Sequence, residues 1–466
     1  RAYGMRTGLY TSPHLEHVNE RIAIDGQQLS DDDFVDAWDQ IKDLVAMVDM
    51  KMEELDKPKM SFFEVLTAMA IWKFADAPVD VAIVEVGMGG RWDATNVLDA
   101  DAAIIGPIDM DHMAWLGNTV EQIASEKVGI IKPGCTAVIG RQPHEEAVIP
   151  IIEEAAAENH ANLVRDGIEA EVVTRIPAVG GQVVTLRTPN GTYAEVPVAK
   201  FGEHQAHNAL AALCAAEVVI PVNGALDGDF VAEALSTVRI PGRIEQIRTS
   251  PTIILDGGHN VNAAESLRAA IEENYDFQQL VGVIAMMGDK QVEEYLGVLE
   301  PLLSHVIVTE NSWRDRVMPA EDLKTVAERV FGAERVTCVP ELPDAIQEAV
   351  NMVDADDELG VGYGHGVLIC GSFTTAGDAR LMLEEKVNPD LKKPKSERVF
   401  QEAVEPEPRK DQDEADLDFE SDANPDFDIN DFGSVGPDLA EDEDTDVSED
   451  AANTEHADDS SSDDVR

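Results

Sequence analysis

The stretch from Val84 to Asn96, VEVGMGGRWDATN, has residue types that can bind a cation beside an anionic ligand. An apolar run ends at Glu85, and three glycines follow within the next five residues. A carboxylate can coordinate a hard cation through oxygen, and glycines allow the backbone to approach a ligand closely. Taken alone, the stretch is equally compatible with a glycine-rich strand end that carries a solvated Glu.

Two other segments place polar side chains after strand-like runs. Ser12 follows the first apolar run of the chain, and His112 follows the run at 102–105. Ligands in open α/β sheets bind outside the carboxyl ends of the strands. A single histidine is more often structural than a ligand. Three strand ends that offer a hydroxyl, a carboxylate and an imidazole nevertheless favour a shared site at Ser12, Glu85 and His112.

The elements that must position these residues alternate between strands and helices through residues 1–390. This alternation is typical of parallel sheets with crossover helices, so we expect an α/β fold. Helices are expected to begin at Ser30, Ser61 and Thr119, whose hydroxyls can cap the first amides. The strands expected to be buried in the first half are Arg6–Thr11, Val79–Val86 and Ala102–Ile105.

The second half of the alternation predicts a separate doubly wound sheet. Its expected strands are Thr252–Leu255, Val281–Met286, Val306–Val308 and Val367–Cys370. Between the two sheets, residues 168–198 alternate in short segments with turn signals, which predicts a small antiparallel appendage. We therefore expect a partial central domain over 1–240, a C-terminal α/β domain over 241–390 and a tail over 391–466.

Acidic residues dominate the charge of the chain. Its 466 residues include 92 Asp and Glu against 35 Lys and Arg, a formal net charge of −57, and residues 401–466 hold 26 acids and 3 bases. Nucleic acids and anionic membranes attract basic proteins, so neither is an expected partner. An acidic body is typical of proteins in a salt-rich cytoplasm, where salt screens self-repulsion. The tail has too few apolar residues to form a core, and we expect it to be disordered.

The cysteines and the apolar runs exclude further classes of protein. The four cysteines lie far apart and form no CxxC pair, which argues against a zinc site and a disulfide framework. No apolar run reaches the roughly 18–20 residues of a membrane span, and the first residues do not resemble a secretory signal. We expect a cytoplasmic protein with reduced thiols.

Nine sequence blocks occur in a fixed order over residues 1–385. They are GLYTSPHLEHVNERI, SFFEVLTAMA, EVGMGGRWDATN, DMDHMAWLG, EKVGIIKPG, HNALAAL, PGRIE, DGGHN and CGSF. The series resembles the ordered motifs of the folylpolyglutamate synthase and dihydrofolate synthase family, within the Mur ligase superfamily. A short block such as DGGHN would be weak evidence alone, whereas the order of all nine makes the resemblance specific.

The resemblance implies a Mur-ligase-like α/β fold and an ATP-dependent ligase that uses Mg²⁺. In such a ligase, ATP phosphorylates a carboxylate, and the amino group of L-glutamate attacks the acyl phosphate to form an amide. A carboxylate is a poor electrophile until it carries the phosphate. The charge that develops on the transferred phosphoryl group needs a metal ion and cationic side chains. The implied substrates are ATP, L-glutamate and either dihydropteroate or a folate.

The resemblance also implies roles for individual residues. Lys127 is either a surface lysine or, by resemblance, a residue that becomes carbamylated and binds a second Mg²⁺ as an anion. His259 could equally be structural. The full implied set is Ser12, Glu85 and His112 as metal ligands, Lys127 and His259 as catalytic residues, Asn208, Arg243 and Asp256 as ATP contacts, and Asp93 and Ala94 as pterin-substrate contacts.

One motif of that family is missing from these residues. No GxxxxGK[ST] phosphate loop occurs in the 466 residues, although the family's loop precedes GLYTSPHL by one crossover helix. Because the chain also begins at Arg1, we expect it to be the downstream part of a longer sequence, inactive by itself, with Tyr10 and Val84 left uncovered.

Two other readings of the motifs remain open. One is a different Mur-type ligase that acts on another acid, such as a cell-wall precursor. The other is a non-enzyme, either a degenerate scaffold protein or an inactive fragment, whose motifs record ancestry. A monomer is the family expectation, and the acidic tail could join the chain to a further folate-pathway domain.

Overall fold

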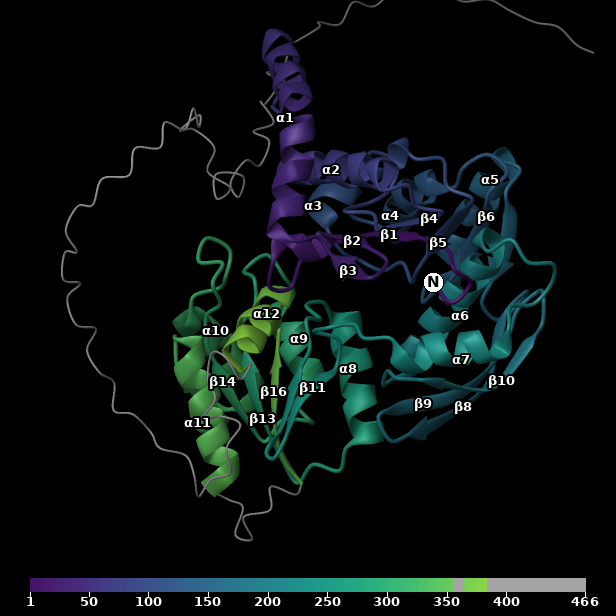
Figure 1. Ribbon diagram of the computed structural model, residues 1–466. Helices are drawn as coiled ribbons and strands as arrows, with labels where there is room; N and C mark the ends of the chain where they lie inside the picture. The colour runs from purple at the N-terminus through teal and green to yellow at the C-terminus, as the bar shows by residue number, and fades with distance from the viewer. Residues whose placement is uncertain (356–363, 384–466) are drawn as a thin grey trace, which may run out of the picture.

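Residues 1–355 and 364–383 are described by a computed structural model (Figure 1). They form two α/β bodies, which we call the first body (residues 1–240) and the second body (residues 241–355 and 364–383). The predicted α/β class is confirmed. The predicted domain limits stay a prediction, and the tail predicted for 391–466 lies outside the described residues.

The first body contains a mixed four-stranded sheet in the order β3-β2-β1-β4. Its elements are β1 (Thr7–Tyr10), η1 (Val18–Arg21), β2 (Ile22–Ile24), β3 (Gln27–Gln28) and β4 (Val81–Val84). β1 is parallel to β4 and antiparallel to β2. A tight turn at Asp25 and Gly26, both with positive φ, joins β2 to β3. The parallel pair places the residues that follow β1 and β4 at the same sheet edge.

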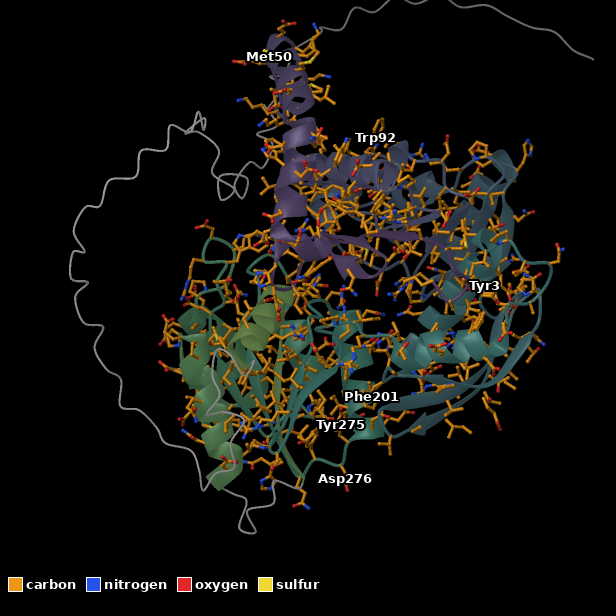
Figure 2. The ribbon with its side chains drawn as sticks, viewed as in Figure 1. Tyr3, Met50, Trp92, Phe201, Tyr275 and Asp276 are labelled. Atoms are coloured by element: carbon orange, nitrogen blue, oxygen red, sulfur yellow. The ribbon has the colours of Figure 1, made fainter. Side chains whose placement is uncertain are left out.

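Two long helices cover this sheet, α1 (Asp31–Glu54) and α2 (Phe62–Asp76). Both begin where the sequence predicts, because the hydroxyls of Ser30 and Ser61 accept hydrogen bonds from amides of the first turn. α1 projects beyond the body, and Met50 near its far end is 59% exposed (Figure 2). Although α1 has 24 residues, no helix in the described ranges combines the length and apolarity needed to cross a membrane.

The outer strand of this sheet differs from the expectation. The apolar run Val79–Val86 predicts a buried strand, but Ile83 in β4 is 48% exposed. In the described chain β4 pairs only with β1, so no strand covers its other edge. The expectation of an uncovered Tyr10 is also wrong, because its ring is fully buried against α2, with its hydroxyl 3.1 Å from Thr67 Oγ1. Val84 is partly buried.

A separate parallel sheet in the order β5-β6-β7 belongs to the same body. Its elements and the helices around it are η2 (Ala94–Val97), β5 (Ala102–Ile105), α3 (Met113–Leu116), α4 (Val120–Lys127), η3 (Val128–Ile130), β6 (Thr136–Ile139), α5 (Glu145–Glu158) and β7 (Asn162–Arg165). α4 begins after its predicted cap, Thr119, and packs through a fully buried Ile123. β5 has a partner on one side only among the described strands, and its Ile104 is 45% exposed.

The predicted antiparallel appendage is present as a three-stranded sheet in the order β10-β9-β8. Its strands and the helices beside it are β8 (Glu171–Ala178), β9 (Gly181–Arg187), β10 (Thr192–Val198), α6 (Glu203–Val219) and α7 (Gly228–Thr237). Val184 and Leu186 are fully buried in the cluster that the sheet shares with α6. Glu217 of α6 also accepts hydrogen bonds from Thr188 and Tyr193, which ties the appendage to the helix.

The second body has one continuous six-stranded sheet in the order β11-β12-β16-β13-β14-β15. Its elements are β11 (Glu245–Thr249), β12 (Thr252–Leu255), α8 (Val261–Asn274), β13 (Gln279–Ile284), α9 (Val292–Leu299), β14 (His305–Val308), α10 (Ala320–Phe331), η4 (Ala333–Arg335), β15 (Val336–Cys338), α11 (Leu342–Ala355), β16 (His365–Cys370) and α12 (Phe373–Leu383). All strand pairs are parallel except β11 with β12. Helices α8, α9 and α10 share one core with the sheet, and α11 and α12 share the other. The predicted second doubly wound sheet is confirmed.

Candidate active site

The first candidate group forms where β1 and β4 end. The backbone amide of Ser12 donates a hydrogen bond to Glu85 Oε2 at 2.8 Å, and the Glu85 amide donates to the Tyr10 carbonyl at 2.9 Å. Burial raises the pKa of the Glu85 carboxyl. The Ser12 amide and the cations Arg243 and Arg21 partly oppose this rise. The two predicted residues Ser12 and Glu85 are therefore brought together, as the parallel strand pair requires.

Arg243 reaches this group from the second body. Its guanidinium lies 5.4 Å from the centre of the Phe373 ring and near enough to Glu85 to favour the charged carboxylate. Asp256, which is 5% exposed, stabilises the chain beside Arg243. It accepts hydrogen bonds from the amides of Ile244 and Gly258. Burial raises the pKa of Asp256, while these amides and Arg243 oppose the rise. Asp256 therefore shapes the loop that carries Arg243.

Asn208, the third predicted ATP contact, lines a cavity of about 640 Å³ between α6 and α8. Polar side chains around it include those of Arg141, His204 and Glu265. Burial, followed by the charge of Arg243, lowers the pKa of His204 to about 4. The cavity thus opens close to Arg243, and its volume is within the range of small-ligand sites.

His112 lies in the loop that follows β5, and Lys127 is close enough to influence its charge. His112 is the residue before α3 and has a left-handed backbone, with φ of 50°. Burial lowers the pKa of His112, and the nearby Lys127 lowers it further. Burial also lowers the pKa of Lys127, with Asp111 opposing. The two predicted residues therefore share one partly buried region, and each loses some of its tendency to carry a positive charge.

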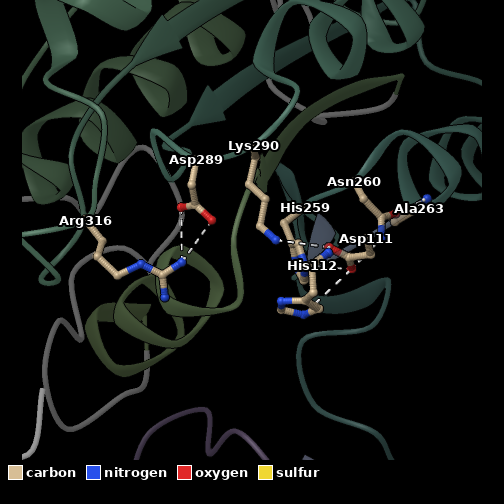
Figure 3. A network of polar contacts seen from close by, with 8 residues as sticks. All are labelled: Asp111, His112, His259, Asn260, Ala263, Asp289, Lys290 and Arg316. Atoms are coloured by element: carbon tan, nitrogen blue, oxygen red, sulfur yellow. Dashed lines mark hydrogen bonds and ion pairs between the residues drawn. The ribbon is translucent and has the colours of Figure 1, made fainter. Parts of the chain in front are cut away.

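Asp111 joins that region to the second body (Figure 3). Its carboxylate lies 3.2 Å from Lys290 Nζ and 3.9 Å from His259 Nε2, and it accepts a hydrogen bond from Asn260 Nδ2 at 3.4 Å. Burial opposes the charge on Asp111, but His112, Lys290 and His259 together hold its pKa below the usual value. His259 and His112 consequently both lie within 4.0 Å of the Asp111 carboxylate, although they come from different bodies.

The predicted magnesium site is only partly assembled by these contacts. Ser12 and Glu85 are adjacent, whereas the described partners of His112 are Asp111 and the groups around it. Among residues 1–355 and 364–383, no three His, Cys, Asp or Glu side chains are grouped closely enough to hold a metal ion. The Ser12 hydroxyl and the buried Glu85 carboxylate are oxygen donors of the kind that Mg²⁺ prefers. The three-residue site stays a prediction.

The predicted pterin contacts lie on the loop after β4. Asp93 caps η2 and accepts hydrogen bonds from the amides of Met88 and Thr95, so its carboxylate shapes the loop. Ala94 is the first residue of η2. Trp92, beside them, is 85% exposed on the outer surface (Figure 2). The loop therefore presents an exposed aromatic face that the sequence analysis did not single out.

Several charged residues of the site are absent from the predicted set. Arg21 is 8% exposed and donates from Nε to His14 Nδ1 at 2.9 Å, beside Glu85. Asp111 and Arg21 both lie in the quoted blocks DMDH and NERI, so the motifs contained a signal for them. Lys290 lies in no quoted block, and only its contact with Asp111 reveals it.

Two domain families match the chain. The Mur ligase middle domain matches residues 38–216, and the Mur ligase glutamate ligase domain matches residues 242–373. The dihydrofolate synthase/folylpolyglutamate synthase of Mycobacterium tuberculosis is 43% identical over 393 residues, which are 81% of this chain and 80% of that protein. A probable bifunctional folylpolyglutamate synthase/dihydropteroate synthase of Halobacterium salinarum is 31% identical over 387 residues, which are 82% of this chain and 44% of that protein.

Solved structures have the same fold. The Mycobacterium tuberculosis folylpolyglutamate synthase complexed with ADP superposes with a TM-score of 0.77 at 43% identity, over 82% of this chain and 85% of that chain. An E. coli relative in complex with DHPP and ADP has a TM-score of 0.69 at 27% identity, over 83% of each chain. Because a relative 43% identical to it matches about four fifths of both sequences, the chain belongs to the dihydrofolate synthase/folylpolyglutamate synthase family of Mur ligases.

Proposed function

We propose that this chain carries the site for ATP-dependent ligation of L-glutamate to dihydropteroate, to folates or to both. The observation that carries the proposal is that the charge of Arg243 acts both on the cavity residue His204 and on the Glu85 carboxylate. Asn208 and His204 line this cavity, so it opens near Arg243, and Arg243 is in turn near enough to Glu85 to favour the charged carboxylate. A nucleoside in the cavity would direct its phosphates toward a cation and a metal-binding carboxylate. The relatives solved with ADP and with DHPP support these substrate classes.

In the first half of the reaction, a carboxylate oxygen of the pterin substrate attacks the γ-phosphorus of ATP, and ADP leaves. Arg243 would bind the phosphate oxygens through its planar guanidinium, and Asp256 would hold its loop in place. Ser12, Glu85 and His112 would hold Mg²⁺, which supplies charge neutralisation at the phosphates. Asp93 and Ala94 would border the pterin end through the loop they form.

In the second half, the amine of L-glutamate attacks the acyl carbon, the amide bond forms and inorganic phosphate leaves. The attacking nitrogen must lose a proton. Burial and the nearby Lys290 lower the pKa of His259, so its imidazole is uncharged at neutral pH and can accept that proton. The lowered pKa of Lys127 favours its neutral amine, the form that reacts with CO₂ to give a carbamate able to bind a second Mg²⁺.

The cellular setting is part of the proposal. We infer a monomer that works in the cytoplasm at high salt, because a net charge of −57 is tolerated best where ions screen it. Relatives from Halobacterium salinarum and Haloferax volcanii are both described as probable bifunctional folylpolyglutamate synthase/dihydropteroate synthases. Their names support a role for the acidic segment 391–466 as a link to a second folate-pathway domain.

The test is ADP release coupled to amide formation from ATP, L-glutamate and dihydropteroate or tetrahydrofolate. Residues 1–466 contain no GxxxxGK[ST] segment, so we expect no ligation from this chain alone. A chimaera in which about 50–60 residues of the family pattern, with a GxxxxGK[ST] loop, precede residue 1 should be active. An inactive, correctly folded chimaera would contradict the proposal. Activity of residues 1–466 alone would support the ligase but contradict the need for the loop. The rates with dihydropteroate and with tetrahydrofolate are compared to find which pterin acceptor is preferred.

A further inference from the structure

Leu15 belongs to the first body by sequence but packs in the core of the second. It follows β1 and Ser12, yet its side chain is only 9% exposed and lies in the cluster that α11 and α12 form on the sheet of the second body. In Figure 1, α12 lies beside the purple N-terminal part of the chain. An apolar side chain from one body is therefore inserted into the other, three residues from a proposed metal ligand.

Glu20 gives the segment around Leu15 a defined shape. The Glu20 carboxylate accepts hydrogen bonds from three consecutive amides, those of Leu15, Glu16 and His17, at 2.7 to 2.9 Å. Hydrogen bonds to a charged acceptor are stronger than neutral ones, so this turn is preorganised before it meets the second body.

α12 provides the surface on which this segment rests. A Cβ added at Gly377 would lie 2.0 Å from the carbonyl oxygen of Leu15, so only glycine allows the segment to sit at this position. One turn further along α12, Arg380 forms an ion pair with Glu16 and a second one with Glu245 at 3.2 Å. Backbone and side-chain contacts of the segment thus converge on one helix.

The same segment touches the loop that carries Arg243. A Cβ at Gly242 would lie 3.1 Å from Leu15 Cδ1, and the Gly242 amide donates a hydrogen bond to Glu245 at 2.8 Å. Upstream, the Ser12 amide is bound to Glu85. Leu15 therefore connects the two groups, Ser12 and Arg243, that border the Glu85 carboxylate from different bodies.

We propose that Leu15, Gly377 and Arg380 are positioning residues, through which α12 holds the Leu15 segment and fixes Ser12 and Arg243 relative to Glu85. The docking contact stands on geometry alone. Its role in nucleotide binding rests on the proposed function of the Glu85 site.

The test compares two Gly→Ala substitutions in residues 1–466. Both lie within helices, where alanine is ordinarily the better residue. Gly377→Ala forces the Leu15 carbonyl away, whereas Gly297→Ala in α9 adds a methyl group with no atom within 4 Å and serves as the matched control. Hydrogen exchange of the Leu15, Glu16 and His17 amides should become at least about tenfold faster in Gly377→Ala and stay unchanged in Gly297→Ala. MgADP affinity, measured by calorimetry on the same two variants of the active chimaera, should fall about tenfold in Gly377→Ala only.

The outcomes separate docking from function. Unchanged exchange at residues 15–17 in Gly377→Ala overturns the docking contact, and faster exchange with unchanged MgADP affinity overturns its positioning role. If the unsubstituted chimaera, which carries the phosphate loop, does not bind MgADP, the proposed nucleotide site is wrong, and exchange alone decides the docking.

A second pair of variants covers the case in which Gly377→Ala fails to fold. Arg380→Met should reproduce its effects, Arg380→Lys should restore most of the protection, and Arg329→Met in α10, which breaks a 2.6 Å ion pair to Glu293 within the second body, should do neither. Equal effects of Arg380→Met and Arg329→Met would contradict the proposal.

Discussion

The two bodies share an alternation of strands and helices but differ in how their sheets are completed. In the second body six strands form one sheet, and Ile254 and Ile307 within it are fully buried. In the first body the strands are divided among three sheets, and Ile83 and Ile104 on β4 and β5 are 48% and 45% exposed. An apolar run therefore predicts a strand reliably, but it predicts burial only where another strand and helix layer cover it.

The candidate site residues of the first body stay together although its strands belong to separate sheets. β1 and β4 remain a parallel pair, so Ser12 and Glu85 still meet. The second body, whose sheet is complete, supplies Arg243 and His259 from loops beside β12. The chemistry is thus shared between an incomplete sheet and a complete one, and the following substitutions probe that arrangement.

The largest effect is expected at Glu85, at the end of the exposed edge strand. In the active chimaera, Glu85→Ala should lower the rate of ligation at least about 100-fold, because it removes the proposed metal-binding carboxylate. The measurement is ADP release at saturating substrates, with circular dichroism to verify the fold. Glu348→Ala, on the exposed face of α11, is the control and should leave the rate unchanged. Activity retained in Glu85→Ala would remove Glu85 from the site.

Two Ile→Ala substitutions, one in each kind of strand, test the difference between the sheets directly. Ile254→Ala, in the complete sheet, should lower the free energy of unfolding by about 2–5 kcal/mol, whereas Ile83→Ala, on the exposed edge, should cost less than about 1 kcal/mol. Urea titration followed by circular dichroism gives both values. Similar losses at the two positions would mean that β4 is covered in solution.

The pH dependence of stability should reveal the lowered pKa of His204, which lies on α6 at the cavity between the bodies. Its pKa in the folded chain is lowered to about 4, below the unfolded value near 6.5, so the unfolded state binds a proton more readily between these values. Stability should therefore fall as the pH drops from about 6.5 toward 4, by up to a few kcal/mol from this group. His204→Gln should show a smaller fall than the parent chain over that window. Identical pH profiles of the two chains would mean that His204 stays solvated.

The smallest effect is expected from removal of the acidic segment. Deleting residues 396–466 should leave the melting temperature nearly unchanged at high salt, because a segment with so few apolar residues adds little buried surface to either body. Differential scanning calorimetry of the two chains at equal salt makes the comparison. A fall of more than about 5 °C would mean that the segment contributes contacts to the folded bodies.

Local features of the fold were predictable because their causes lie within a few residues. Ser30, Ser61 and Thr119 begin helices since each hydroxyl caps an amide of the next turn. The motif blocks likewise placed Ser12 and Glu85 at strand ends, where the parallel pairing makes them meet. The burial predicted for Val79–Val86 failed because coverage of a strand depends on elements that its own sequence does not specify.

The sequence by itself determined the family, the alternation of strands and helices, and the side chains available at each strand end. Only the tertiary structure decided which of these side chains lie together across the two bodies. Lys290 approaches Asp111 over 179 positions of sequence, and Leu15 enters the core beneath α12 more than 350 residues away. The physical reason is that periodicity and capping act over one or two turns, whereas such contacts depend on how whole sheets and helices pack against one another.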